Sequence, residues 1–372
     1  MSDKRSKEFD RRRDRRKNDS TNTPSFLQAP IILDRRECSE PGSTSHEPEK
    51  PKKSFAQISD IDAHCSYIPF MRRPNKFNTD AILKMLTDYP GHFAIGVIGK
   101  QGVGKSTILS HFAPNSKQVF PIQEVNQYLY QGHKTEGIDI HVTPERAILL
   151  DTEPILDWTV LDKALRTGNL GGLHPDLWLE MENLYNIIFI MSVCNVVLVL
   201  ADGPEYDIDL LRLLQRAAML KFNIPDFPLL ESQQDMNYYP DIVFVSNKCR
   251  KEEFTLEKYS RLDAILGSFF QESQLRTKGL TRFSEVLPLF ESDNNSNLFF
   301  LPDWSEKTQV ESFDVLVCAL RNQVFTAPRR SGRKGQVSEK DWYRNAVRVY
   351  ELVRKSEYIL EYLQVLRKLK DS

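Results

Sequence analysis

Apolar residues gather in short runs separated by longer amphipathic stretches, and this pattern predicts an α/β fold. The runs are rich in small and branched side chains, which is typical of parallel strands covered on both faces. We expect buried strands at 93–98, 147–150, 193–200, 242–245 and 298–301. Helical stretches such as 175–190 and 207–221 lie between them. Strands that alternate with helices predict a doubly wound sheet with helices on both faces.

The segments around this domain differ from it in composition. Residues 1–54 are polar and are expected to form a disordered tail. Within it, Pro30-Ile31-Ile32-Leu33 predicts a short linear motif for a partner, and the basic run at 11–17 is either a solvated tail or an RNA contact or import signal. Residues 55–326 are expected to form the domain, in which Thr79 caps a short helix, and 327–337 a linker. Within 338–372, a final helix from Asp341 to about Leu369 should pack its apolar stripe on the domain or on a partner.

Composition and charge argue against several classes of protein. The 50 basic and 51 acidic residues nearly cancel, so no global field draws the molecule to nucleic acid or to an anionic membrane. The five cysteines form no C-x-x-C pair, which argues against zinc and fits a reducing compartment. Residues 1–16 lack the apolar core of a secretory signal, and the apolar run at 187–201 is too short to span a bilayer. We expect a cytoplasmic protein, also nuclear as an alternative, with no membrane and no direct sequence-specific nucleic acid as partner.

The segment after the first buried strand carries the clearest chemical signature. Residues Gly99-Lys100-Gln101-Gly102-Val103-Gly104-Lys105-Ser106 satisfy G-x-x-x-x-G-K-S/T in full and lead through Thr107 into a helix. The glycines let the backbone curl so that its N–H groups converge on phosphate oxygens at the positive end of the helix. Lys105 is expected to reach the β and γ phosphates and Ser106 to bind Mg²⁺. The order of strand, loop and helix predicts a phosphate-binding site for a purine nucleotide.

Two further residues are candidates for the magnesium site. Asp151 follows the strand at 147–150, where a carboxylate holds Mg²⁺ through water in nucleotide-binding folds. Thr135 lies where the switch threonine of a GTPase approaches the metal. The alternatives are a solvated aspartate at a strand end and a polar turn threonine. The predicted metal ligands are therefore Ser106, Thr135 and Asp151.

Several positions depart from what a hydrolysing GTPase needs. In D-x-x-G the glycine N–H senses the γ-phosphate, but Asp151-Thr152-Glu153-Pro154 ends in proline, which has no N–H. Asn247 and Lys248 match the start of the guanine-binding N-K-x-D, whereas Arg250 replaces the aspartate and offers no acceptor. No glutamine follows Asp151 to orient water, although His133 is a candidate for that role. We expect slow or absent hydrolysis, and the base stays open between guanine (GTP or GDP) and adenine (ATP or ADP).

Further short runs make the chain similar to a known family. The domain resembles the GTPase superfamily, nearer its dynamin-like and guanylate-binding branches. More narrowly, the chain resembles the ninth, GTPase-like members of the SMG family of nonsense-mediated mRNA decay factors, over most of its length. Besides the phosphate-binding loop, this resemblance rests on Pro30-Ile31-Ile32-Leu33, Gly137-Ile138-Asp139, Asp151-Thr152-Glu153-Pro154-Ile155-Leu156, Tyr238-Tyr239-Pro240, Asn247-Lys248, Glu339-Lys340-Asp341-Trp342 and Val353-Arg354-Lys355-Ser356.

The resemblance implies a regulatory role. It implies pairing through the GTPase-like domain with the eighth SMG protein, and binding of the pair to the SMG PI3-kinase-like kinase that phosphorylates the decay helicase. It also implies that the nucleotide is structural, in agreement with Pro154 and Arg250. An active GTPase switch of the dynamin-like type and an RNA-binding adaptor are the alternatives.

Overall fold

The computed structural model describes residues 67–73, 76–114, 118–122, 133–221, 239–304, 311–328 and 337–371. All of them belong to one unit, Asp60–Ser372. The predicted tail at 1–54, with its basic run and its apolar motif, lies outside the described residues, as do residues 329–336 of the predicted linker. Among the described helices, none is both long enough and apolar enough to cross a lipid bilayer.

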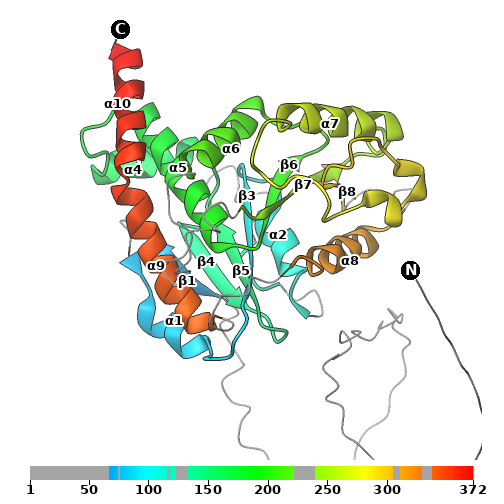
Figure 1. The fold of residues 1–372 in the computed structure, drawn as a ribbon, viewed down its shortest axis with the longest axis horizontal. Helices are drawn as coiled ribbons and strands as arrows, with labels where there is room; N and C mark the ends of the chain where they lie inside the picture. The colour runs from blue at the N-terminus through cyan, green and yellow to red at the C-terminus, as the bar shows by residue number, and fades with distance from the viewer. Residues whose placement is uncertain are drawn as a thin grey trace, which may run out of the picture. The chain divides into compact units, whose positions relative to one another are not determined.

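An eight-stranded sheet lies at the centre of the fold and confirms the predicted α/β class (Figure 1). Its order is β2-β1-β4-β5-β3-β6-β7-β8. The neighbours β5, β3, β6, β7 and β8 run parallel, whereas β4, β1 and β2 extend one edge in antiparallel pairs. The strands are β1 Ile68–Arg72, β2 Lys76–Phe77, β3 Phe93–Gly99, β4 Ile138–Val142, β5 Ala147–Thr152, β6 Val196–Asp202, β7 Asp241–Cys249 and β8 Leu298–Pro302.

The strand order positions the ligand site. β3 lies between β5 and β6: the chain continues from β3 to β4 and β5 on one side of it, and then crosses from β5 to β6 on the other side. In doubly wound sheets, the crevice beyond the carboxyl ends of the strands at such a point is where ligands bind. The loop after β3, which carries the G-x-x-x-x-G-K-S sequence, opens into that crevice.

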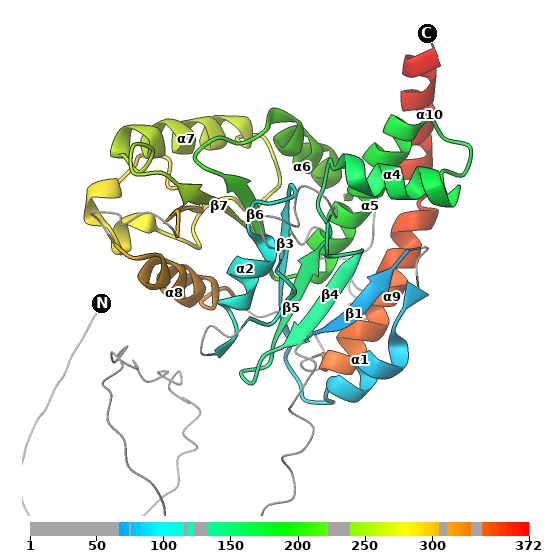
Figure 2. The ribbon, with the colours of Figure 1, turned by 180° about the vertical axis from the view of Figure 1, so that it is seen from behind.

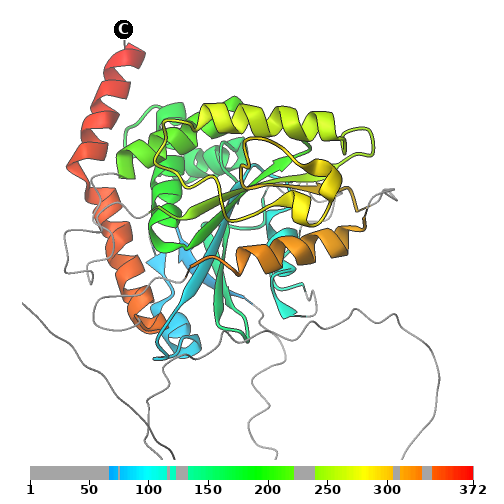
Figure 3. The same cartoon turned by 45° about the vertical axis from the view of Figure 1, so that its right-hand side comes forward.

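Helices cover both faces of the sheet. Figure 3 shows α5 and α9 on one side and α2 and α8 on the other, and Figure 2 shows the same arrangement from behind. The side chain of Asp157 caps α4, because it accepts a hydrogen bond from the N–H of Thr159. The helices are α1 Thr79–Met85, α2 Lys105–Ser110, α4 Trp158–Thr167, α5 Pro175–Val193, α6 Ile208–Lys221, α7 Leu256–Phe269, α8 Phe313–Val324, α9 Glu339–Lys355 and α10 Glu357–Asp371, with short 3-10 turns η2 Phe283–Glu285 and η3 Pro288–Phe290.

Two predicted element ends are wrong. Val193 was expected to begin a strand, but it is the last residue of α5, and β6 begins at Val196. Between them Asn195 turns the chain, since its side-chain oxygen accepts a hydrogen bond from the N–H of Ala94 at 2.9 Å. Thr79 was expected to cap α1 but lies inside that helix, and its hydroxyl shares a hydrogen bond with the hydroxyl of Tyr343 at 2.9 Å.

The segment before the phosphate-binding loop packs against the end of the chain. Trp342 on α9 is fully buried, and its indole N–H donates to the carbonyl of Val193 at 2.9 Å. Its ring centroid lies 6.0 Å from that of Phe70 on β1. Glu339, at the start of α9, is also fully buried and is ion-paired with Arg146. Helix α9 therefore completes the core of the domain together with the antiparallel edge of the sheet.

The predicted single C-terminal helix is two helices. Helix α9 ends at Lys355, Ser356 adopts an extended ψ of 120°, and α10 begins at Glu357. The side chain of Arg354 on the last turn of α9 pairs with Glu182 on α5, which holds α9 against the domain at this point. Val353 and Leu360, on either side of the break, are seven residues apart, as two apolar positions on one face of a continuous helix would be, and for that reason the sequence pattern does not reveal the break.

Candidate nucleotide-binding site

The phosphate-binding loop runs from the end of β3 into the first turn of α2. Gly102 and Gly104 have φ angles of 80° and 91°, a left-handed conformation that favours glycine. A Cβ atom on Gly104 would lie only 2.4 Å from Nδ2 of Asn247. Glycine is therefore required at position 104 both by the backbone conformation and by the close approach of β7.

Lys105 is the buried cation of the site. The residue is 7% exposed, and its ammonium donates a hydrogen bond to the carbonyl of Lys100 at 2.8 Å. Burial lowers the pKa of Lys105 from 10.5 to about 8, and Asp151 is the largest of the carboxylates that oppose this effect. Because its hydrogen-bond partner is a carbonyl, the charge of Lys105 is suited to an anionic ligand such as phosphate.

The three predicted metal ligands meet around one carboxylate. Oδ2 of Asp151 accepts hydrogen bonds from the hydroxyls of Ser106 at 2.8 Å and Thr135 at 3.0 Å. Asp151 is fully buried, and burial raises the pKa of its carboxyl against the effect of Lys105. Its Oδ1 atom is buried and has no hydrogen-bond partner within the described part of the chain.

These residues fit Mg²⁺. The ion commonly uses one or two protein carboxylates and completes its shell with hydroxyls, waters and ligand phosphates. A free buried carboxylate oxygen beside two hydroxyls meets that description, and a cation there would favour the ionised carboxylate. In the described ranges no cluster of three or more His, Cys, Asp or Glu side chains could hold a metal. The roles of Ser106, Thr135 and Asp151 as metal ligands stay a prediction.

Glu153, which the sequence did not single out, holds together the segment beside the metal ligands. Glu153 is 4% exposed, and its Oε2 accepts a hydrogen bond from the N–H of Gly137 at 3.0 Å. Its own N–H donates to the carbonyl of Gly137 at 2.8 Å. Its Oε1 is ion-paired with Arg73 and accepts a hydrogen bond from Asn186 at 3.1 Å. The loop that carries Thr135 is thus fixed by a protein carboxylate.

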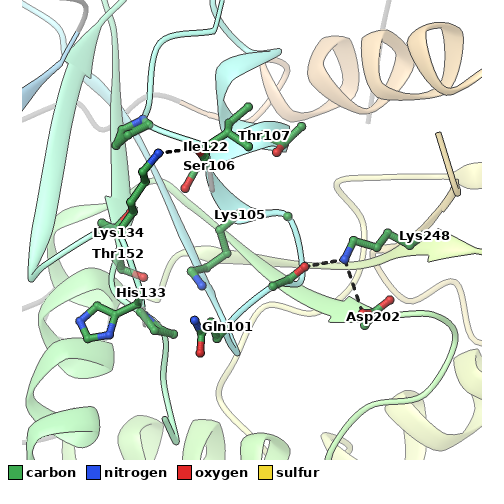
Figure 4. Close-up of a pocket in the computed structure, with 15 residues that line it drawn as sticks. Gln101, Lys105, Ser106, Thr107, Ile122, His133, Lys134, Thr152, Asp202 and Lys248 are labelled. Atoms are coloured by element: carbon green, nitrogen blue, oxygen red, sulfur yellow. Dashed lines mark hydrogen bonds and ion pairs between the residues drawn. The ribbon is translucent and has the colours of Figure 1, made fainter. Parts of the chain in front are cut away.

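Asn247 and Lys248 brace the loop from the other side. Nδ2 of Asn247 donates to the carbonyl of Val103 at 2.9 Å. The ammonium of Lys248 donates to the carbonyl of Gly102 at 2.6 Å and lies 3.6 Å from Asp202 (Figure 4). Oδ1 of Asn247 is buried and has no partner in the ranges that the structure describes.

Arg250 lies outside the cavity beside the loop. Its backbone N–H donates to the carboxylate of Glu253 at 2.9 Å, and its side chain is not among those that line the cavity. In N-K-x-D the aspartate accepts hydrogen bonds from guanine. Arg250 stands in its place here and supplies no such acceptor.

A cavity of about 470 Å³ lies over the loop (Figure 4). Of the predicted site residues, it is lined by Gln101, Gly102, Gly104, Lys105, Ser106, Thr107, Thr135 and Lys248. Gly99, Val103, Asn247 and Asp151 lie behind this lining, and the side chain of Lys100 is ion-paired with Asp207. Sequence reasoning missed the lining residues Pro121, Ile122, Lys134 and Asp202, which come from separate segments.

His133 also lines the cavity but is fixed by α4. Its Nδ1 lies 2.6 Å from the hydroxyl oxygen of Thr159, which itself donates to Asp157 at 2.7 Å. The Thr159 proton is committed to Asp157, so Nδ1 of His133 carries the hydrogen in the neutral ring. Burial lowers the pKa of His133, and in Figure 4 the ring points away from Lys105. The structure therefore gives no support to His133 as a group that orients water, and that role stays untested.

Comparison with known proteins finds relatives of this chain by sequence. No protein-family model matches the chain. It is 30% identical over 333 residues to "Nonsense-mediated mRNA decay factor SMG9" of Xenopus laevis, covering 77% of this chain and 64% of the relative. Proteins of the same name match from Salmo salar, at 29% identity with coverage of 85% and 68%, and from Caenorhabditis elegans, at 25% with coverage of 66% and 64%. The chain thus spans 64% of the length of the Xenopus laevis relative.

Two elongation factors share part of the fold. One is translation elongation factor SelB from Methanococcus maripaludis in complex with a GTP analogue, at 13% identity and a TM-score of 0.31, covering 65% of this chain and 34% of that one. The other is a bacterial selenocysteine-specific elongation factor, at 10% identity and a TM-score of 0.32, covering 64% and 28%. Scores this low carry no argument about ligand or activity.

Proposed function

The chain is a homologue of the SMG9 nonsense-mediated mRNA decay factors, and on that premise we propose that it is a nucleotide-binding, non-hydrolysing regulatory subunit in this pathway. The proposal rests on the site as well as on the relatives. The amides of the loop, Lys105 and Ser106 would hold the phosphates, and Ser106, Thr135 and Asp151 would hold Mg²⁺. When bound, the ion neutralises phosphate charge and links the nucleotide to the buried Asp151 carboxylate.

The way the loop with Thr135 is held supports the proposal that the protein does not switch with its nucleotide. The loop that bears Thr135 is held by three groups of the protein, because Glu153 binds both the N–H and the carbonyl of Gly137 and Asp151 binds Thr135. In a switching GTPase, contacts to the γ-phosphate and its metal order this loop, and hydrolysis releases it. Here Pro154 has no N–H to make the second such contact. The nucleotide would therefore stabilise the fold, and the conformation of the loop would not depend on whether a γ-phosphate is bound.

Two measurements test the proposal. Mass spectrometry of small molecules released from the purified protein should detect a purine nucleotide, and its identity would settle the base. Single-turnover hydrolysis should be far below the rate of an assisted GTPase, which is on the order of tens per minute or faster. Hydrolysis at such a rate, alone or with a partner, would establish the active switch instead, and a protein that retains no nucleotide would exclude both.

We further propose partners from the resemblance to the ninth SMG proteins. The chain would form a heterodimer with the eighth SMG protein through its GTPase-like domain in the cytoplasm. The pair would restrain or tune the SMG PI3-kinase-like kinase that phosphorylates the decay helicase. Size-exclusion chromatography of the coexpressed proteins tests the first step, and a kinase assay with and without the pair tests the second. Separate elution, or an unchanged phosphorylation rate, would contradict the corresponding step.

A further inference from the structure

Helix α10 presents apolar side chains in two directions. Ile359 is fully buried and Leu363 is 9% exposed, and this side of the helix packs against the domain through α5. Beyond these contacts α10 projects past the other described elements, as Figures 1 and 3 both show. The buried side accounts for the attachment of α10 but leaves a second set of apolar residues outside.

The second set forms a seam with regular spacing. Tyr358, Tyr362, Val365 and Leu369 follow one another at intervals of four, three and four residues. At 3.6 residues per turn these four positions lie within about 60° of one another around the helix axis. Tyr358, Val365 and Leu369 are 42%, 54% and 68% exposed, whereas Tyr362 is half-buried and packs against the core. Alternating intervals of three and four are the spacing with which one α-helix packs against another. We call these four residues the α10 seam.

Charged residues flank the α10 seam in a segregated order. Glu357 and Glu361 lie beside its first half and Lys368 beside its second half. All three are exposed, and within the described part of the chain none of them is in an ion pair. A helix that matches this surface carries basic residues opposite the two glutamates and acidic residues opposite the lysine.

We propose that the α10 seam docks an amphipathic helix of a partner protein, with a heptad-spaced apolar stripe and with basic and acidic residues at opposite ends. The inference rests on the proposed function: the GTPase-like domain makes the first contact with a partner, and the α10 seam would make a second. The seam is narrow, since the other apolar side of α10 is already buried, whereas membrane-binding helices present a broad apolar face.

The size of the seam favours a heterologous partner over a second copy of this chain. Its four side chains can bury roughly 400 Å² on this subunit, because even large aromatic side chains contribute only about 150 to 250 Å² each and these are partly covered. A stable pair needs about 800 Å² on each partner. The seam alone is therefore too small to hold a dimer, and it suits a partner that is also bound elsewhere on the domain.

The test uses the full chain reconstituted with the two proposed partners. The double variant Val365→Asp, Leu369→Asp places charge on the seam at exposed positions, and circular dichroism should show the wild-type fold. We expect its affinity for the partner complex to fall by roughly tenfold or more, as for a disrupted apolar anchor. The matched control Leu289→Asp changes a residue on η3 that is 79% exposed and should bind like the wild type.

A photo-crosslinker in place of Val365 identifies the occupant. A crosslink to a helical partner segment with segregated charges supports the inference. A crosslink to a second copy of this chain, or binding of the wild type but not the double variant to phosphatidylserine vesicles, would overturn it in favour of self-association or a membrane. Unchanged affinity of the double variant for the partner complex would contradict the docking role of the α10 seam and leave the proposed function standing. If the wild type binds neither partner, the proposed function fails and the seam inference fails with it.

Discussion

Replacing Lys105 by methionine should stabilise the nucleotide-free protein and abolish its stabilisation by nucleotide. Burial lowers the pKa of Lys105 from 10.5 to about 8. At ~1.4 kcal/mol per pKa unit, this difference makes the charged ammonium unfavourable in the folded state by about 3 kcal/mol. Methionine has a similar length and no charge, but it gives up the hydrogen bond to the Lys100 carbonyl, a loss of ~1 kcal/mol. We therefore expect Lys105→Met to raise the free energy of unfolding at neutral pH by about 2 kcal/mol.

The pH dependence of this effect has a definite sign. Between pH 10.5 and about 8, the unfolded chain keeps the Lys105 proton while the folded chain releases it. The unfolded state then binds more protons, so the stability of the wild type rises with pH across this window. The unfavourable contribution of Lys105 is full below the folded pKa and absent above the unfolded one. The advantage of Lys105→Met should therefore be largest at neutral pH. Above pH 10.5 only the lost hydrogen bond remains, and the variant should be less stable than the wild type by ~1 kcal/mol.

Thermal melts of the two proteins, with and without nucleotide and Mg²⁺, measure these effects. An unfolding entropy of ~2.1 cal/mol/K per residue over roughly 300 folded residues gives about 1.5 °C per kcal/mol, so the variant should melt about 3 °C higher at neutral pH. Nucleotide at roughly 100 times its dissociation constant should add about 2.7 kcal/mol to the wild type and nothing to the variant. A variant that melts lower than the wild type in nucleotide-free buffer, or that keeps the full nucleotide shift, would refute the reasoning.

Three further substitutions test other parts of the structure. Glu153→Gln removes a buried charge partner and should lower the urea-unfolding free energy by about 3 kcal/mol, whereas Glu136→Gln breaks an exposed pair and should lower it by less than about 1 kcal/mol. Gly104→Ala forces a Cβ against β7 and should abolish nucleotide binding in calorimetry; wild-type affinity would contradict the loop geometry. Trp342→Ala should destabilise the whole domain by about 3 to 5 kcal/mol, while Trp158→Ala, at 72% exposure, should leave the melting temperature nearly unchanged. Equal effects of the two tryptophan variants would contradict the packing of α9.

The phosphate-binding loop and the parallel strands were predictable from sequence because their signals are local. The loop needs glycines, Lys105 and Ser106 at fixed spacing between a strand and a helix, and all of these lie within a few residues. The strands at 242–245 and 298–301 show up as apolar runs because both faces of each are covered. Strands β1 and β2, by contrast, were missed, since both are short and have neither a long apolar run nor a clear alternation.

Glu153 shows why part of the site could not be predicted. Its partners Gly137, Asn186 and Arg73 are 16, 33 and 80 residues away in the chain. No local pattern tells a buried, fully paired glutamate from a solvated one, because the difference lies in residues that only the fold brings together. The break between α9 and α10 was hidden for a related reason, since Val353 and Leu360, on either side of Ser356, keep the seven-residue interval of a continuous helix.

The burial of Trp342 and Glu339 against the antiparallel edge of the sheet has a consequence for synthesis of the protein. The ribosome delivers β1 and α1 long before α9, so the growing chain must keep apolar residues such as Phe70 exposed until α9 has emerged. Contacts this distant in sequence also slow folding. A nascent chain that stops before residue 339 would leave an unfinished core, and we expect chaperones to retain it and proteases to remove it.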